Sequence, residues 1–196
     1  QETTEFPQVA KGITPSGLLS DSETAWLATL SVDKRRRDWL LGRLTAKQLL
    51  QTVLQNTTQG EIGEPLPLDQ IVIANDAEGA PFASLKGVRL GYSLSISHSN
   101  GAAFCAVHPE ITVGADMERI ETRDWSFVRS YFTQSEISLV EAALPQQRDL
   151  LSTAIWSGKE AVLKVLRKGL RLDTRTIECR FDPMRASSTD WVPFAV

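Results

Sequence analysis

The sequence lacks the features that would place it in a membrane or outside the cell. None of its apolar runs approaches the ~20 residues that a helix needs to cross a bilayer. Its first five residues are polar or acidic, so no signal peptide is recognisable. It has only two cysteines, Cys105 and Cys179, which are far apart and lie among apolar residues. Two buried thiols in a reducing compartment are favoured, with a disulfide as the alternative. We therefore expect a cytoplasmic protein without a membrane partner.

The sequence also lacks an excess of basic residues. It carries 21 Lys and Arg against 24 Asp and Glu, which gives a formal net charge of −3, whereas nucleic-acid-binding domains are usually basic. Hydrophobic residues make up 42% of the 196 residues and charged residues 23%, which is the balance of a globular protein that can bury a core. We therefore expect a globular protein with no nucleic-acid partner.

Local patterns predict several helices. Ser20-x-x-Glu23 and Thr133-x-x-Glu136 are typical of capping boxes, in which each side chain accepts a hydrogen bond from the other residue's backbone amide. Each box is expected to open a helix, and further helices are predicted over about residues 33–55, 125–131 and 146–168. Gly169 is expected to end the last of these helices.

Strand signals lie in the middle and at the end of the chain. Apolar and β-branched runs predict strands over residues 71–73, 92–96, 102–107, 111–117, 175–181 and 191–196. Turns are expected at residues 79–81 and 99–101, which contain Gly, Pro or Asn. This order predicts an α+β protein with two halves of similar size, residues 1–110 and 111–196.

Two acidic residues lie close together in the expected strand 111–117 and just after it. Alternate side chains of a strand share a face, so Asp116 and Glu118 would point together. Taken alone, two solvated acids on an exposed strand are the favoured interpretation. Neighbouring carboxylates are also the ligands that magnesium prefers, and a second motif favours this metal interpretation.

A third carboxylate lies on the expected helix 146–168. Glu160 and Lys164 are one turn apart on the side opposite the apolar residues, and a Glu-first pair at this spacing supports a helix. A surface ion pair is the plain structural interpretation. A carboxylate beside a cation also suits phosphoryl transfer, in which a metal neutralises phosphates, a base accepts a hydroxyl proton and a lysine stabilises the leaving charge.

A third motif is Ser97-His98, which ends an expected strand before a Gly-containing turn. Taken alone, a histidine at such a position is more often structural. Together with the neighbouring serines, His98 forms a group of small hydrogen-bond donors that suits a phosphate. The other histidine, His108, lies before a proline at a strand end and is expected to be structural.

These motifs together resemble the 4'-phosphopantetheinyl transferases of the surfactin-synthetase-activating type. The family pattern is a Ser-His turn, then G-x-D-x-E, then W-x-x-K-E-A with a further Lys, and the chain has these at residues 97–98, 114–118 and 156–164. Residues 132–136 are similar to the family's F-[ST]-x-x-E helix start, and residues 35–43 to its R-R-x-x-W-L-x-G-R helix. The resemblance covers about residues 20–179.

The resemblance implies a magnesium site and two catalytic residues. Asp116, Glu118 and Glu160 would hold the ion, which also binds the pyrophosphate of coenzyme A. Glu160 would accept the proton of a carrier-protein serine, directly or through a water. Lys164 would stabilise the charge that develops on the pyrophosphate as 3',5'-ADP leaves.

The resemblance also implies residues that bind coenzyme A as a substrate. His98, Arg35 and Arg43 would bind its 3'-phosphate, and Ser97 and Lys159 are further candidates for binding the cofactor. His98, Arg35 and Arg43 come from residues 1–110, the half that would hold the 3'-phosphate. The acids would come from the other half.

The family fold implied is a pseudo-dimer of two similar α+β halves, with the active site in the cleft between them. A monomer is expected, because one chain supplies both halves of the site. The implied function is that of a holo-[acyl-carrier-protein] synthase: Mg-dependent transfer of 4'-phosphopantetheine from coenzyme A to an acyl or peptidyl carrier protein, in trans or within a larger synthase. Two alternatives are a non-catalytic module that binds coenzyme A or carrier proteins, and a magnesium phosphohydrolase unrelated to carriers.

Overall fold

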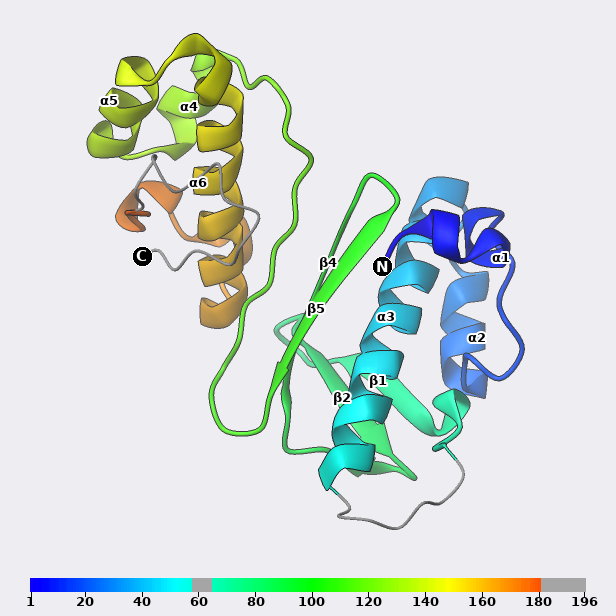
Figure 1. Ribbon diagram of the computed structural model, residues 1–196. Coiled ribbons are helices and arrows are strands. Elements are labelled where there is room, and N and C mark those ends of the chain that lie inside the picture. The colour runs from blue at the N-terminus through cyan, green and yellow to red at the C-terminus, as the bar shows by residue number, and fades with distance from the viewer. Residues whose placement is uncertain (58–64, 181–196) are drawn as a thin grey trace. The chain divides into compact units, whose positions relative to one another are not determined.

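The computed structural model describes residues 1–57 and 65–180 (Figure 1). The chain divides into two compact units, Gln1–Met117 and Glu118–Val196. Within the described ranges, no helix is both long and apolar enough to cross a membrane. Helices and strands are both present, which confirms the mixed α+β class predicted from the sequence. The pseudo-dimer arrangement stays a prediction.

The helices of the first unit are α1 (Pro7–Ala10), α2 (Asp21–Ala28) and α3 (Asp33–Thr57), and short 3-10 turns span Thr3–Glu5 and Leu68–Gln70. The predicted capping box begins α2. The Ser20 hydroxyl accepts a hydrogen bond from the amide of Glu23 (3.3 Å), and the Glu23 carboxylate accepts one from the amide of Ser20 (3.0 Å). These contacts satisfy amides that the first turn of a helix leaves without partners.

The strands of the first unit form two antiparallel sheets. The first contains β1 (Ile71–Asn75), β2 (Pro81–Leu85) and β3 (Val88–Arg89), and the second is the hairpin of β4 (Ser93–Ser99) and β5 (Ala102–His108). In the hairpin, Ser97 lies opposite Phe104. Its turn places both Asn100 (φ 50°) and Gly101 (φ 78°) in the left-handed region, as a two-residue turn matched to the twist of the strands requires.

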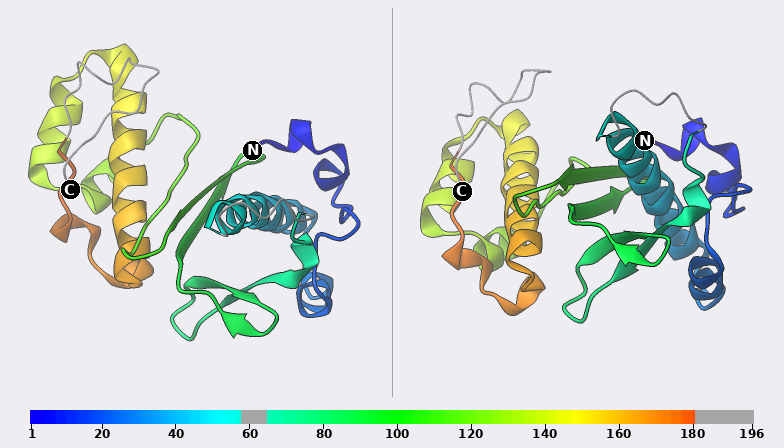
Figure 2. Two further views of the ribbon diagram at one scale, coloured as in Figure 1. Left: turned by 60° about the horizontal axis from the view of Figure 1, so that its bottom comes forward. Right: turned by 90° about the horizontal axis from the view of Figure 1, so that it is seen from below.

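Helix α3 is the element around which the first unit packs. Seen nearly along its axis, it lies against the curved strands (Figure 2), and it contacts β1, β4 and β5. Its leucines supply two apolar clusters. Leu40 and Leu44 pack with residues of α1 and α2, and Leu50 packs with Ile71 and Ile73 of β1. The burial of these leucines accounts for the stability of α3 better than the helix propensity of its residues does, since tertiary packing supplies most helical stability in proteins.

The second unit contains α4 (Trp125–Tyr131), α5 (Gln134–Ala142) and α6 (Pro145–Leu166), followed by 3-10 turns at Gly169–Arg171 and Thr174–Thr176. The second predicted capping box, Thr133 with Glu136, begins α5. Aromatic rings fill its core: Trp156 of α6 meets Phe127 and Tyr131 of α4 with centroid distances of 4.9 and 5.1 Å.

Several sequence-based predictions are confirmed and three are wrong. The helices and the strands around residues 71–73, 92–96 and 102–107 are present within a few residues of the expected bounds. Residues 111–117 form no strand, because their amides bond to side chains, as described below. Of the expected strand 175–181, residues 175–179 also form no strand, and residue 181 lies outside the described residues. The expected strand 191–196 lies outside the described residues.

The third wrong prediction concerns the end of α6. Gly169 does not end this helix; Arg167 does, in the left-handed conformation (φ 55°), and its amide bonds to the carbonyl of Lys164. Gly169 instead begins the following 3-10 turn, also with positive φ. A residue in this conformation commonly ends a helix, and it is usually, but not always, glycine.

Candidate functional site

A cavity of about 630 Å³ lies in the first unit, between residues of α2 and α3 and residues of β1 and β4. This volume is in the range of small-molecule pockets. Arg35 and Arg43 of α3 and His98 of β4 all line it. The structure thus brings together the three residues that the resemblance assigned to the 3'-phosphate. The side chains that sequence reasoning missed at this cavity include Trp26, Trp39 and Asn75.

Arg43 is the most buried of these three residues, at 9% exposure. Its guanidinium carbon lies 4.6 Å from the ring centroid of Trp39, and its Nε lies 3.7 Å from Oε1 of Glu23. Burial lowers the pKa of Arg43, and the nearby Glu23 charge opposes this shift. Nε is buried and makes no hydrogen bond among the described residues. A guanidinium that is held on an aromatic ring at the wall of a cavity suits a phosphate oxygen.

Glu23 is the sole acid among the described residues that line the cavity. Its carboxylate forms an ion pair with Lys47, whose ammonium is fully buried and lies 2.5 Å from Oε2. Oε1 accepts a hydrogen bond from the amide of Ile73 (3.2 Å), and Lys47 also donates to the carbonyl of Leu18 (2.7 Å). Burial lowers the pKa of Lys47, and the hydrogen bond with Glu23 opposes the shift. With Glu23 paired to Lys47, the two cavity arginines leave an excess of positive charge.

A glycine of α3 permits close packing of this helix on β4, beside His98. A Cβ atom at Gly42 would lie 3.2 Å from Cγ2 of Ile96 and 3.9 Å from Cδ2 of His98. Helix α3 therefore approaches β4 more closely than a larger residue would permit without a shift of Ile96. His98 is exposed and lies at the cavity beside this contact.

Ser97 faces away from the cavity, because neighbouring side chains of a strand point to opposite faces. It is 6% exposed. Its hydroxyl donates a hydrogen bond to Oδ1 of Asp116 (2.9 Å) and accepts one from the amide of Met117 (3.2 Å). This placement does not support the cofactor-binding role predicted for Ser97. It does support a link between Ser97 and Asp116, a predicted metal ligand.

The contact of Ser97 with Met117 is one of three. The hydroxyls of alternate β4 serines accept hydrogen bonds from alternate amides of the following segment: Ser93 from Val113 (3.0 Å), Ser95 from Ala115 (2.9 Å) and Ser97 from Met117 (3.2 Å). We call these three hydroxyls the serine row. They take the place of the backbone carbonyls of a strand partner. This is why residues 111–117 are not a strand although their sequence alternates like one.

The predicted metal ligands belong to different units. Asp116 lies in the first, and Glu118 and Glu160 lie in the second. Oε2 of Glu118 is 3.8 Å from Nη2 of Arg123. Glu160 and Lys164 are half-buried and one turn apart on α6. Within either unit, the described residues form no group of three His, Cys, Asp or Glu side chains that could hold a metal, so the magnesium assignment stays a prediction.

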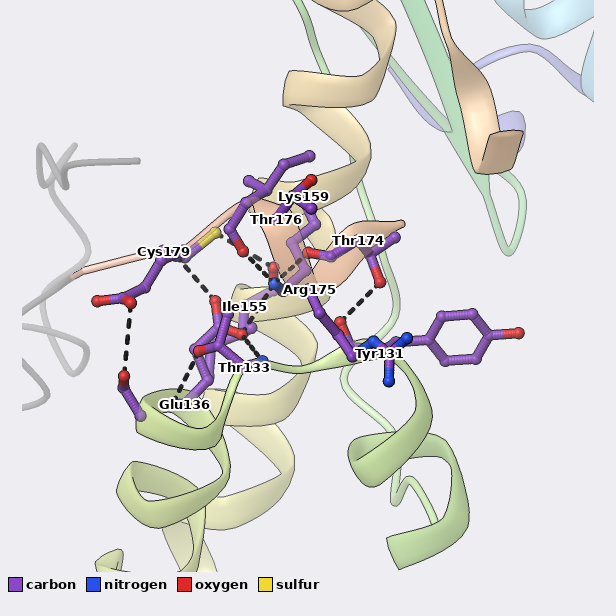
Figure 3. A network of polar contacts seen from close by, with 12 residues as sticks. Tyr131, Thr133, Glu136, Ile155, Lys159, Thr174, Arg175, Thr176 and Cys179 are labelled. Atoms are coloured by element: carbon purple, nitrogen blue, oxygen red, sulfur yellow. Dashed lines mark hydrogen bonds and ion pairs between the residues drawn. The ribbon is translucent and has the colours of Figure 1, made fainter. Parts of the chain in front are cut away.

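Lys159 is placed in the interior of the second unit (Figure 3). Its ammonium is fully buried, forms an ion pair with Oε2 of Glu136 (2.8 Å), and donates to the carbonyls of Thr174 (2.8 Å) and Ile177. An ammonium has three N–H donors, and three protein oxygens receive them here. The cofactor-binding role predicted for Lys159 is therefore not supported by its placement.

Lys159 and Glu136 bind part of the backbone of residues 174–179, which form no strand. Glu136 completes the network: its Oε1 accepts the amide of Cys179 (2.8 Å), and its Oε2 accepts the amide of Thr133 (2.7 Å). The carbonyls of Thr174 and Ile177 and the amide of Cys179 are thus bound by buried side chains (Figure 3). The described residues contain no disulfide, and Cys105 and Cys179 are both thiols, as expected.

Comparisons with known proteins point to one family. Residues 112–194 match the model of the 4'-phosphopantetheinyl transferase superfamily. The chain is similar to the 4'-phosphopantetheinyl transferase HetI of Nostoc sp. (26% identical over 155 residues, 78% of this chain and 61% of the relative). It is also similar to the 4'-phosphopantetheinyl transferase AcpT of Salmonella typhimurium (31% over 132 residues, 66% and 58%). The comparisons support the 4'-phosphopantetheinyl transferase family.

A third similar protein is a 4'-phosphopantetheinyl transferase of Bacillus subtilis, 30% identical over 86 residues, which are 44% of this chain and 38% of that protein. The matched part of the chain spans about three fifths of HetI and of AcpT. These matches agree with the family named by the sequence motifs. The surfactin-synthetase-activating subgroup stays a prediction.

Proposed function

We propose that this protein transfers the 4'-phosphopantetheine arm of coenzyme A to a serine of an acyl or peptidyl carrier protein. The observation that carries the proposal is the cavity of the first unit, where Arg35, Arg43 and His98 converge with excess positive charge. The similarity to proteins named 4'-phosphopantetheinyl transferase supports the same reaction. The proposed enzyme is a holo-[acyl-carrier-protein] synthase of the surfactin-synthetase-activating type.

The cavity would hold the adenosine end of coenzyme A. Arg35 and Arg43 would donate to the oxygens of the 3'-phosphate, because guanidinium groups match the geometry of phosphate. His98 would add a third donor from the opposite wall. Trp26, which is 55% exposed, and Trp39 offer flat apolar surface for a purine ring.

The proposed metal ligands fit magnesium by their chemistry. The three proposed ligands, Asp116, Glu118 and Glu160, all offer carboxylate oxygens. Such hard oxygen ligands are the ones that magnesium prefers. The Asp116 carboxylate is already held in one orientation by a hydroxyl. When bound, magnesium would neutralise the pyrophosphate of coenzyme A and raise its reactivity.

The reaction itself would use two residues of α6. Glu160 would accept the proton of the carrier serine, whose oxygen forms a bond to the phosphorus that bears the pantetheine arm. The bond from this phosphorus to 3',5'-ADP breaks, and Lys164 would stabilise the negative charge on the leaving phosphate. Both side chains are half-buried on the same stretch of helix, where a partly desolvated charge acts more strongly than in water.

The runner-up is a module that binds coenzyme A or carrier proteins without turnover. The cavity alone fits either function, because it includes none of the proposed metal ligands or catalytic residues. The retention of Asp116, Glu118, Glu160 and Lys164 favours the enzyme.

The reaction is tested by intact mass spectrometry of an apo carrier protein incubated with this protein, coenzyme A and magnesium. We expect a gain of one phosphopantetheine group that a chelator abolishes, and Asp116→Ala should abolish the gain while the protein stays folded. Binding of coenzyme A with no gain on several acyl and peptidyl carriers would instead identify the non-catalytic module. Near-normal transfer by Asp116→Ala would refute the metal assignment.

The cavity is tested by calorimetric titration with coenzyme A and with 3'-dephospho-coenzyme A. Loss of a hydrogen bond to a charged group costs about 1.5–3 kcal/mol, so His98→Ala should weaken coenzyme A binding about 10- to 100-fold. It should leave binding of the dephospho compound unchanged. The matched control is His108→Ala, since His108 Nδ1 accepts the amides of Glu110 and Ile111 (3.0 Å each) and has a structural role. An equal loss for both ligands would refute the phosphate role of His98.

A further inference from the structure

The serine row contains one member that does more than bind a backbone amide. Ser93, Ser95 and Ser97 lie on one face of β4, and each hydroxyl accepts one amide of residues 113–117. Ser97 also donates to Oδ1 of Asp116 at 2.9 Å. The row therefore fixes the path of the segment, and its last member fixes a side chain as well.

The geometry of Ser97 leaves its hydroxyl little freedom. A hydroxyl has one proton to donate and lone pairs to accept with. At Ser97, the proton is directed at Asp116 and a lone pair receives the amide of Met117. Ser97 is 6% exposed, so water competes little for either contact. A buried hydroxyl that both donates and accepts a hydrogen bond restricts the orientation of the carboxylate that it contacts.

We infer that Ser97 is a positioning residue that orients the Asp116 carboxylate for a divalent cation. This inference rests on the proposed function, in which Asp116 is a ligand of magnesium. A hydrogen bond to one carboxylate oxygen fixes the plane of the group, so less conformational freedom is lost when a cation binds. Groups that orient metal ligands in this way typically contribute 10- to 100-fold to metal affinity or activity.

The competing interpretation is that Ser97 only clamps the backbone. The serine row itself supplies the control. Ser95 is as buried as Ser97 (3% against 6% exposed), occupies the same face of the same strand, and accepts the amide of Ala115 at 2.9 Å. Ser95→Ala therefore removes one backbone contact of the row and leaves the hydroxyl that contacts Asp116 in place.

The test measures Mn²⁺ affinity by electron paramagnetic resonance of the full chain, in the presence of coenzyme A. We expect Ser97→Ala to weaken Mn²⁺ binding about 10- to 100-fold, and Ser95→Ala to bind within about twofold of the unchanged protein. Ser97→Thr, which keeps the hydroxyl, should restore most of the affinity. Asp116→Ala should show the largest loss.

A second readout separates orientation of the metal ligand from binding of coenzyme A. In Ser97→Ala, the affinity for coenzyme A without metal should be unchanged, and the magnesium concentration for half-maximal transfer should rise by the same factor as the Mn²⁺ dissociation constant. Equal Mn²⁺ affinity of the Ser97→Ala and Ser95→Ala variants would overturn the inference. Weaker metal-free binding of coenzyme A by Ser97→Ala would overturn it in favour of a direct cofactor contact.

Two further outcomes are covered by the design. If Ser97→Ala does not fold, the pair Ser97→Thr and Ser97→Val has the same shape with and without the hydroxyl, and equal Mn²⁺ affinity in this pair overturns the inference. If the unchanged protein transfers phosphopantetheine but binds no Mn²⁺ and ignores chelators, the metal assignment of the proposed function fails and the inference fails with it. The unchanged protein therefore tests the proposed function, and the serine variants test the inference.

Discussion

Replacement of Lys159 by methionine tests whether this lysine supports the fold or binds coenzyme A. The change keeps the apolar stem and removes the ammonium. Glu136 then loses its buried counter-charge at 2.8 Å, and the carbonyls of Thr174 and Ile177 lose a donor. Removal of one partner of a buried ion pair typically costs about 3–5 kcal/mol. Glu136 keeps two amide donors, so we expect a loss of about 3 kcal/mol, near the lower end of this range.

The assay is urea unfolding of the full chain followed by circular dichroism. Lys34→Met is the matched control, because Lys34 also pairs with an acid at 2.8 Å (Asp38) but has a side chain that is 73% exposed. Exposed ion pairs contribute about 0–1 kcal/mol, so this control should unfold close to the unchanged protein. The coenzyme A affinity of folded Lys159→Met, measured without urea, should be unchanged.

The opposite pair of results would refute the reasoning. If Lys159→Met unfolds at the same urea concentration as Lys34→Met but binds coenzyme A more weakly, Lys159 binds coenzyme A, as the resemblance implies. Should the single variant be too unstable to isolate, the double variant Lys159→Met with Glu136→Gln removes both charges. Glutamine keeps one of the two oxygens that accept amides and removes the charge that would be left unpaired. The double variant should therefore lose less stability than the sum of the two single changes.

Two further predictions concern buried ionisable groups. Burial raises the pKa of Cys179 from 9.0 to about 11, so its thiolate is scarce at pH 8. Iodoacetamide should modify half-buried Cys105 first and Cys179 only after unfolding, as read by peptide mass spectrometry; equal rates would contradict this burial. Because folding raises this pKa, the stabilising contribution of the protonated thiol is complete below about pH 9 and is lost as the pH rises through about 11. Glu23→Gln removes the counter-charge of buried Lys47 and should lower the free energy of unfolding in urea by about 3–5 kcal/mol. The control Asp21→Asn, at an exposed position, should change this free energy little. Similar urea midpoints for the two variants would refute the stabilising role of the Glu23–Lys47 pair.

The sequence predicted the elements whose signals are local. Both capping boxes, Ser20 with Glu23 and Thr133 with Glu136, were found because the partners lie three residues apart and need no knowledge of the fold. The turn at Asn100 and Gly101 was found for the same reason. Strand β2 is not predicted, because residues 79–81 are assigned to a turn, whereas Pro81 is the first residue of β2 and lies opposite Asn75 of β1.

The segment 111–117 shows the limit of alternation as a strand signal. Alternation reports which side chains share a face, but a strand also requires backbone partners. Here the partners of Ala115 and Met117 are the hydroxyls of Ser95 and Ser97. These serines were interpreted from sequence as donors for a phosphate, since nothing in their composition distinguishes a ligand contact from a contact with a later part of the chain.

The same ambiguity applies to the predicted site residues, which the structure places in two kinds of surroundings. Arg35, Arg43 and His98 meet at a cavity as the resemblance implied, whereas Ser97 and Lys159 have their hydrogen-bonding groups directed at protein atoms. A sequence motif identifies positions that the fold uses, and it does not identify what each side chain contacts. Only the tertiary partners of a polar group decide between support of the fold and contact with a ligand.

Helix α6 extends this argument to neighbouring residues of one motif. Successive positions on a helix are rotated by about 100°, so Lys159 and Glu160 cannot share their surroundings: Lys159 is fully buried and Glu160 is half-buried. Lys159→Met should therefore lower the amount of folded protein and leave turnover per folded molecule largely intact. Glu160→Gln should abolish turnover and lower the free energy of unfolding by less than Lys159→Met does, because Glu160 is only half-buried. Loss of turnover per folded molecule in both variants would show that the motif acts as one catalytic unit and that its lysine does more than support the fold.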